Sequence, residues 1–233
     1  MNWPAACLAE IRDDIDAAVR RDPAARSRLE VLLTYPGVHA LLLHRVSHRV
    51  DAAGWRLVAR VMSHIGRMLT GVEIHPRAQI GRDFFIDHGM GVVIGETTII
   101  GNGCHLTQGV TLGGTSTRRE KRHPTLEDNV MIGAGAKIIG AVTIGEGARI
   151  GAGSVVVSSV PAGATVVGVP GHIIAYTNRS NETVERLPDP EWDRIDALER
   201  RLALLEARLA SQSPEVRAQE ARTPEPRAEG FTR

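Results

Sequence analysis

Residues 130–156, VMIGAGAKIIGAVTIGEGARIGAGSVV, decide the fold of this chain. An aliphatic residue returns at every sixth position from Ile132 to Val156, and glycine or alanine fills many of the places between. Helices repeat about every 3.6 residues and strands every two, so neither keeps an aliphatic residue in phase over steps of six. Short strands that turn a corner every six residues do keep it. The stretch therefore predicts a parallel β-helix of triangular coils.

The same period extends toward the N-terminus as far as Ile74, with two interruptions. Two extra residues enter between Ile86 and Ile94, and eight enter between Leu112 and Leu126. Because a solenoid accommodates insertions only where they bulge from a corner, we expect functional residues in both. The repeated aliphatic residues are Ile74, Ile80, Ile86, Ile94, Ile100, Leu106, Leu112, Leu126, Ile132, Ile138, Ile144, Ile150 and Val156.

The segments on either side of the repeat have helical periods. Up to Thr70 the apolar residues fall at helical spacing, with breaks at residues 22–23 (DP), 36–37 (PG) and Gly54, which predicts three or four helices. Within 191–210, apolar residues alternate steps of three and four, as in a coiled coil: Ile195, Leu198, Leu202, Leu205 and Leu209.

We therefore predict an α+β fold in four parts. A helical segment covers residues 1–70, and the β-helix covers 71–175. A linker and a coiled-coil-like helix cover 176–211. The tail, residues 212–233, is rich in Pro, Glu, Arg and Ser, and we expect it to be disordered.

Composition limits the classes of partner. The 28 Lys+Arg nearly cancel the 27 Asp+Glu, so no broad field is available to hold nucleic acid or an anionic membrane. No stretch approaches the roughly 20 apolar residues of a membrane span, and no signal-like run opens the chain, so we expect a cytoplasmic protein. Cys7 and Cys104 form no C-x-x-C pair and support neither a disulfide framework nor a thiolate zinc site.

The chain resembles the hexapeptide acyltransferases and, among them, the serine O-acetyltransferases. The resemblance covers roughly residues 22–175. It implies a left-handed β-helix that transfers acetyl from acetyl-CoA to the hydroxyl of L-serine, giving O-acetyl-L-serine for cysteine biosynthesis without a metal. Its motifs are 71–76 (GVEIHP), 87–88 (DH), 93–97 (VIGET), 110–115 (VTLGGT), 122–124 (RHP), 130–137 (VMIGAGAK) and 168–170 (GVP).

The implied reaction needs a general base, because an alcohol does not attack a thioester as an alkoxide at neutral pH. His88, in the first insertion, suits this role since imidazole titrates near neutral pH. The resemblance implies that Glu73 is the carboxylate that orients the ring, although Glu73 could instead be a solvated residue at the start of the first coil. We expect direct attack on acetyl-CoA and no role for Cys104 as a nucleophile, because no base stands beside it.

A zwitterionic substrate needs an anion for its ammonium group and cations for its carboxylate. The resemblance assigns Asp22 and Asp87 to the ammonium group, and Arg122 and His123 to the carboxylate. Asp22 could equally cap a helix before Pro23, and Arg122 and His123 could belong to a solvated loop.

Coenzyme A needs a groove in which the backbone approaches its flexible arm, and small residues permit this approach. The resemblance implies such a wall along one side of the coils. The same small residues could serve corner geometry alone. The residues of the expected wall are Gly113, Gly114, Ala134, Gly135 and Ala152.

The resemblance also implies a homotrimer with its sites at subunit boundaries, so that His88 of one chain works with His123 of the next. Some relatives pair two trimers through a longer helical N-terminus, and a dimer of trimers stays open. Many relatives dock O-acetylserine sulfhydrylase through a terminal isoleucine. This chain ends in GFTR (residues 230–233), so we do not expect that docking, and inhibition by cysteine stays open.

Three other functions remain as alternatives. Another hexapeptide acetyltransferase would act on a sugar, homoserine or a xenobiotic alcohol, but residues 21–24 (RDPA) with 122–124 (RHP) favour serine. A hydratase of the γ-carbonic anhydrase kind needs three histidines around a metal, in a close pairing that this sequence lacks. A non-enzymatic trimeric scaffold would have little reason to carry the two insertions.

Overall fold

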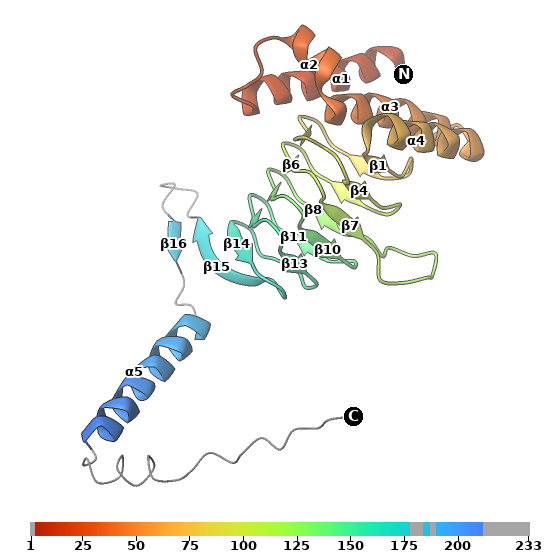
Figure 1. Ribbon diagram of the computed structural model, residues 1–233. Helices are drawn as coiled ribbons and strands as arrows, with labels where there is room; N and C mark the ends of the chain where they lie inside the picture. The colour runs from red at the N-terminus through yellow and green to blue at the C-terminus, as the bar shows by residue number, and fades with distance from the viewer. Residues whose placement is uncertain (1–2, 178–183, 187–189, 212–233) are drawn as a thin grey trace, which may run out of the picture. The chain divides into compact units, whose positions relative to one another are not determined.

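The computed structural model describes residues 3–177, 184–186 and 190–211 (Figure 1). The chain divides into two compact units, Met1–Leu187 and Pro188–Arg233. The tail that we expect to be disordered, residues 212–233, lies outside the described residues.

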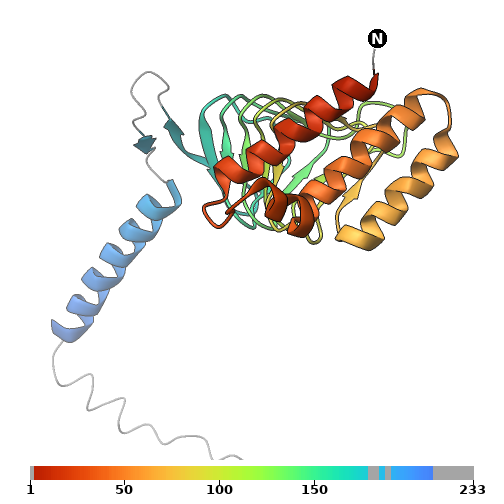
Figure 2. The ribbon, with the colours of Figure 1, turned by 90° about the horizontal axis from the view of Figure 1, so that it is seen from above.

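Four helices precede the coils: α1 (Trp3–Arg21), α2 (Arg28–Thr34), α3 (Pro36–Ala52) and α4 (Arg56–Thr70). Local chemistry sets their ends. Ser27 caps α2 by accepting the backbone N–H of Glu30 at 3.1 Å, Pro36 opens α3, and Gly71 ends α4 with a φ of 71°. Two views show these helices lying across one end of the coils (Figure 1, Figure 2).

Short strands recur in the predicted six-residue phase from β1 to β13, and β14 follows them outside that phase. They are β1 (Glu73–Ile74), β2 (Gln79–Ile80), β3 (Phe85–Ile86), β4 (Val93–Ile94), β5 (Ile99–Ile100), β6 (His105–Leu106), β7 (Thr111–Gly113), β8 (Thr125–Leu126), β9 (Met131–Ile132), β10 (Lys137–Ile139), β11 (Thr143–Ile144), β12 (Arg149–Ile150), β13 (Val155–Val156) and β14 (Ala164–Val167).

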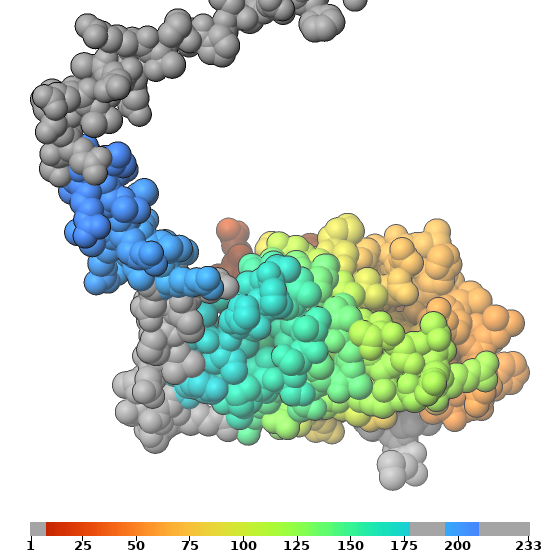
Figure 3. Space-filling view, turned by 90° about the horizontal axis from the view of Figure 1, so that it is seen from below, coloured from red at the N-terminus to blue at the C-terminus, as the bar shows by residue number. Residues whose placement is uncertain are grey.

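Successive coils stack these strands into three parallel sheets, which form the three walls of a prism. Sheet A has the order β1-β4-β7-β10-β13, sheet B has β2-β5-β8-β11, and sheet C contains β3-β6-β9-β12-β14. The register pairs each repeated aliphatic residue with that of the next coil, for example Ile94 with Leu112. The coils lie side by side in sequence order, and the helices follow beyond the first coil (Figure 3). The parallel β-helix is therefore confirmed.

The repeated aliphatic residues form the interior of the prism. Except for the partly buried Ile80, each of them is at most 5% exposed. Complete burial of one such side chain contributes about 1.5–3 kcal/mol. Glycine at the corners allows the coils to touch: a Cβ atom on Gly145 would lie 2.4 Å from the backbone nitrogen of Ala162.

The two insertions occupy two different corners, and both corners border sheet A. Residues 87–91 join β3 to β4 and lie where the strands of sheet A begin. Residues 114–124 join β7 to β8 and lie where those strands end. Sheet A therefore separates the two places where function is expected.

Antiparallel strands that the repeat does not predict complete the last coil. Strand β14 pairs with β15 (His172–Thr177), which pairs with β16 (Val184–Arg186). Ile173 and Tyr176 of β15 pack against the apolar interior and cover it at this end. Their pairing arises from contact with the finished coils, which no local period encodes.

The second unit contains helix α5 (Pro190–Ser211), close to the predicted limits of 191–210. Its seam residues are exposed, from 43% at Ile195 to 68% at Leu209. Among the described residues, no helix combines the length and the apolar composition that crossing a membrane requires.

A buried ion pair fixes helices α1 and α3 to the first coil. Nη2 of Arg45 lies 3.1 Å from Oδ2 of Asp14, and both side chains are at most 6% exposed. The Arg45 guanidinium also donates to the carbonyl oxygens of Ile80 and Gly81, both at 2.5 Å. Asp14 in turn accepts the backbone N–H of Phe84 at 3.2 Å. Burial raises the pKa of Asp14 to about 6.

Replacing Asp14 by Ala should lower the free energy of unfolding by about 3 kcal/mol, because it leaves a guanidinium buried without its carboxylate. Glu10, 3.8 Å from Nε of Arg45, offsets part of the loss. The matched control is Asp16→Ala. The partner of Asp16, Arg28, is 61% exposed, so the loss there should stay below about 1 kcal/mol. Urea titration followed by circular dichroism measures both, and equal losses would contradict the role given to Asp14.

Candidate functional site

The first insertion forms a tight corner that presents His88 to solvent. The backbone of His88 has a φ of 58°, in the left-handed region, and Gly89 follows at 82°. A non-glycine residue in that region costs about 1–3 kcal/mol, and such residues cluster at functional sites. The His88 side chain is 74% exposed, and its Nε2 lies 3.8 Å from Oδ1 of Asp87. An accessible imidazole therefore stands beside a carboxylate.

The helices bring a second carboxylate to this corner. Tyr35 donates its hydroxyl to Oδ2 of Asp22 at 2.5 Å, and the backbone N–H of Ala24 donates to Oδ1 at 2.8 Å. These hydrogen bonds lower the pKa of Asp22. The Asp22 carboxylate raises the pKa of Tyr35 to about 12, so the phenol keeps its proton. Asp22 is therefore an oriented carboxylate at neutral pH.

Gly37 explains why Tyr35 reaches the corner. A Cβ atom on Gly37 would lie 2.1 Å from the carbonyl oxygen of Ile86, so the start of α3 touches the backbone of β3 directly. Ile86 precedes Asp87, and the Asp87 charge adds to the raised pKa of Tyr35. The close approach of α3 thus brings Tyr35 and Asp22 to Asp87.

His123, in the second insertion, is held by hydrogen bonds against Thr97 in the turn after β4. Oγ1 of Thr97 accepts the backbone N–H groups of Arg122 and His123, each at 3.1 Å, and lies 2.9 Å from Nδ1 of His123. The backbone N–H of Thr97 also points at Nδ1, at 3.3 Å. Nδ1 is therefore the acceptor, and the ring carries its proton on Nε2.

The protonation of His123 follows from its burial. Its residue exposure is 9%, and desolvation, followed by the charge of Arg122, lowers its pKa. Gly95 leaves room for the ring, because a Cβ atom there would lie 2.0 Å from Cδ2 of His123. A neutral imidazole thus offers its Nε2–H as a hydrogen-bond donor from this corner.

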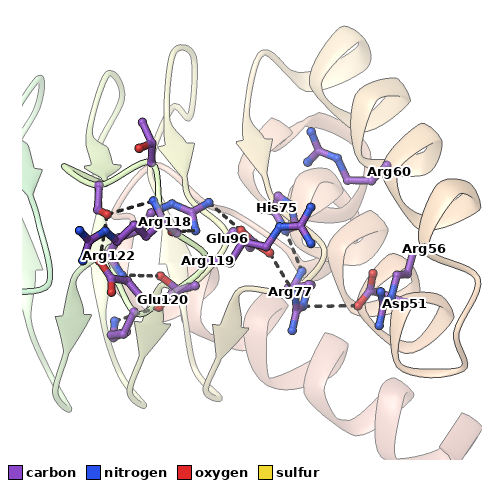
Figure 4. Close-up of a pocket in the computed structure, with 14 residues that line it drawn as sticks. Asp51, Arg56, Arg60, His75, Arg77, Glu96, Arg118, Arg119, Glu120 and Arg122 are labelled. Atoms are coloured by element: carbon purple, nitrogen blue, oxygen red, sulfur yellow. Dashed lines mark hydrogen bonds and ion pairs between the residues drawn. The ribbon is translucent and has the colours of Figure 1, made fainter.

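Glu96 holds Arg122 beside His123. Nη2 of Arg122 lies 2.6 Å from Oε2 of Glu96, while Nη1 of Arg77 lies 3.1 Å from Oε1 (Figure 4). The hydrogen bond from Arg122 lowers the pKa of Glu96, which stays ionised. The loop borders a cavity of about 890 Å³ whose lining is rich in arginine, including Arg56 and Arg60 (Figure 4). Such a lining favours anions.

Glu73 lies on sheet A between the two corners. Its Oε2 is 2.8 Å from Nη1 of Arg67 in α4. Among the described residues, no hydrogen bond or ion pair joins Glu73 to His88. The role predicted for Glu73 beside His88 therefore stays a prediction.

The small residues expected to form a wall fall at both corners. Ala134, Gly135 and Ala152 continue the His88 corner on later coils, while Gly113 ends β7 and Gly114 begins the second insertion. At Gly135, with a φ of 72°, a Cβ atom would meet nothing within 4 Å, so the surface there is open. At Gly114 it would lie 3.1 Å from Cγ of Arg122, so that glycine serves packing.

The predicted polar residues thus form two groups, one at each corner. The first group is Asp22, Asp87 and His88, and the second is Arg122 and His123. In the part of the chain that the structure describes, no hydrogen bond or ion pair links the groups. The first can bind a cation and accept a proton, and the second can bind a carboxylate.

Three residues that hold these groups in place were not identified from the sequence: Glu96, Thr97 and Tyr35. Glu96 and Thr97 stand inside the quoted motif VIGET, so a signal for them existed. Tyr35 gave no signal, because its contact with Asp22 depends on how α2 and α3 pack beside the end of α1.

Metal binding and thiol chemistry receive no support from the described residues. Among them, no group of three His, Cys, Asp or Glu side chains is placed to hold a metal ion. Burial raises the pKa of Cys104 to about 11, so its thiol stays protonated and inert.

The chain is similar to known acetyltransferases over most of its length. Residues 4–42 match the family model "Serine acetyltransferase, N-terminal", and residues 123–158 match "Bacterial transferase hexapeptide (six repeats)". The serine acetyltransferase of Bacillus subtilis is 48% identical over 209 residues, which are 88% of this chain and 96% of that protein.

Two solved structures have the same fold. The Neisseria gonorrhoeae serine acetyltransferase in complex with serine is 42% identical, with a TM-score of 0.71, over 73% of this chain and 70% of that one. A serine acetyltransferase in complex with CoA is 40% identical, with a TM-score of 0.70, over the same shares of the two chains, 73% and 70%.

Replacing Tyr35 by Phe should raise the pKa of Asp22 toward its ordinary value, because the hydrogen bond that lowers it most disappears. Carbon NMR titration of the Asp22 carboxyl group measures the change. Tyr176→Phe, which alters a tyrosine in β15, should leave Asp22 unaffected. An unchanged Asp22 pKa in Tyr35→Phe would show that the phenol does not hold this carboxylate.

Proposed function

This chain belongs to the serine acetyltransferase family, and we propose that His88 is the general base of its reaction. The enzyme transfers the acetyl group of acetyl-CoA to the hydroxyl of L-serine and yields O-acetyl-L-serine for cysteine biosynthesis. The observation that carries the proposal is the exposed His88 imidazole on a left-handed backbone beside Asp87 and Asp22.

His88 moves one proton in each direction. It takes the hydroxyl proton while the serine oxygen bonds to the acetyl carbon, and it returns that proton to the CoA thiolate when the carbon–sulfur bond breaks. The acetyl group passes directly between the substrates, which agrees with the protonated thiol of Cys104. Glu73 is assigned to orient the imidazole. It stands on sheet A, between the two corners.

Serine is held by charge at both ends. Asp22 and Asp87 bind its ammonium group, and the hydrogen bonds to Asp22 keep that carboxylate ionised. Arg122 and the Nε2–H of His123 bind the serine carboxylate. This assignment places the two ends of one small substrate at opposite edges of sheet A.

A site shared between subunits resolves this separation. We assign a homotrimer in which the His88 corner of one chain faces the second insertion of the next, and in which α5 contributes a coiled coil. Closed cyclic assemblies place the same two surfaces together at each boundary. A dimer of trimers and the cytoplasmic location stay predictions.

The arm of CoA runs along the small residues at the same boundary. Ala134, Gly135 and Ala152 continue the His88 corner, and the open space at Gly135 supports this path. Gly113 and Gly114 face it from the edge of the second insertion. This arrangement brings the thioester to the base.

Replacing His88 by Ala should lower kcat by about 10²–10⁴-fold, because the hydroxyl proton loses its acceptor. Release of the CoA thiol, followed with acetyl-CoA and L-serine, measures the rate. His64→Ala, at an exposed histidine on α4, is the control and should stay near wild type. A His88→Ala variant with near-normal kcat would exclude the mechanism.

Complementation tests the shared site. His88→Ala and His123→Ala should each be strongly impaired, but coexpression in equal amounts should leave both histidines at roughly a quarter of the boundaries and restore activity accordingly. The control pair is His88→Ala with Asp22→Ala. Both changes lie at the same corner, so no boundary is complete. Equal activity of the two mixtures would place the whole site within one chain.

A further inference from the structure

Helix α5 carries an apolar seam that packs against no other residue described in its unit. The seam residues are between 43% and 68% exposed: Ile195, Leu198, Leu202, Leu205 and Leu209. They are spaced three and four residues apart in strict alternation. This narrow stripe is typical of a helix that packs on another helix, since a helix lying on a globular surface has a wider one.

The far side of α5 carries charged residues and alanines (Ala197, Ala203 and Ala207) in place of large apolar side chains. Asp196 and Arg200 form an ion pair one turn apart, and both are exposed. Leu204 is the exception, because it is 65% exposed and lies off the seam. The seam is therefore one-sided, as expected for a strand of a coiled coil.

The charged residues on the two sides of the seam have opposite signs. In heptad notation, Ile195, Leu202 and Leu209 are a positions, and Leu198 and Leu205 are d positions. The g positions are all arginine and the e positions within the seam are all glutamate: Arg194, Arg201, Arg208, Glu199 and Glu206.

This arrangement selects one direction of packing. In a parallel pair in register, a g residue faces the e residue of the next heptad on its neighbour. Arg194 then meets Glu199 of a neighbouring copy, and Arg201 meets Glu206. In an antiparallel pair, g faces g and e faces e, which opposes arginine to arginine and glutamate to glutamate. We propose that α5 binds α5 of further copies of this chain, parallel and in register.

The same charges indicate which partner binds the seam. The seam is its own electrostatic complement, so no second kind of partner is needed to satisfy it. Copies related by a cyclic axis are parallel and in register by symmetry, and dihedral pairing would oppose them. The proposed trimer sets only the number of helices, and the direction of packing does not rest on the acetyltransferase reaction.

The seam depends on the rest of the protein for stability. It spans 195–209, about two heptads, and a free helix of that length is marginal in water. Joining the helices to an assembled body raises their effective concentration, so their association becomes intramolecular. The test must therefore use the full chain.

Disulfide trapping between copies tests whether their α5 helices pack parallel or antiparallel. Ile195→Cys should form a covalent dimer on mild oxidation, and so should Leu209→Cys, because equivalent a positions meet in a parallel bundle. In an antiparallel pair an a residue faces a d residue, so each of these two sites lies about ten or more residues, roughly 15 Å or more at about 1.5 Å per residue, from its own copy. That distance is beyond the roughly 7 Å that a disulfide allows. Asp196→Cys, at position b, is the matched control, and the wild-type chain gives the background of Cys7 and Cys104.

Exchanging the charges at the e and g positions tests the register in which the α5 helices pair. Adding Glu199→Arg and Glu206→Arg to Ile195→Cys should slow trapping by roughly tenfold, because every flanking pair becomes repulsive. Adding Arg194→Glu, Arg201→Glu and Arg208→Glu as well should restore the rate. In an antiparallel pair the flanking contacts are like-charged in all three variants, so the rate would not recover in this way.

Three outcomes would overturn the proposal: no trapping of either single variant, trapping only of the double variant Ile195→Cys/Leu205→Cys, which pairs an a with a d position, or equal trapping of Asp196→Cys. Thiol release by reduced Ile195→Cys should match wild type. Failure of the seam is thereby distinguished from failure of the proposed reaction.

Discussion

The fold depends on the burial of one aliphatic residue every sixth position, in register with the same position of the coils above and below. Each such residue lies within a ladder such as Ile74, Ile94, Leu112, Ile138 and Val156, and a slip would break the ladder along the whole prism. The interior therefore tolerates no insertion, and extra residues are confined to corners. That restriction places both functional groups at the corners bordering sheet A.

Rigid coils turn small local features into site geometry. Gly37 brings the start of α3 onto the backbone of Ile86, and this contact carries Tyr35 to Asp22. At the other corner a single hydroxyl, Oγ1 of Thr97, accepts two backbone N–H groups and determines which nitrogen of His123 carries the proton. In both cases a neutral donor, and not a further charge, orients the functional group.

Association between copies connects the two corners in the proposed assembly and also explains the exposed seam of α5. One chain holds a proton acceptor with carboxylates at one edge of sheet A and a cation with an N–H donor at the other. Rotation about a common axis would bring unlike edges together, and it would also make the α5 helices parallel. Catalysis and assembly would then share one symmetry.

The sequence by itself determined the six-residue period, the phase of every strand from β1 to β13, the two insertions and the limits of α5 to within about one residue, because each is a local pattern repeated along the chain. His88, Asp87, Arg122 and His123 could be named because they stand in insertions with motifs. Tertiary structure alone decided the antiparallel β15 and β16, the contact of Tyr35 with Asp22, the pairing of Glu73 with Arg67 and the buried Asp14–Arg45 pair. Those features join segments whose separation in sequence follows no period, so only the packing of finished helices against finished coils brings them together.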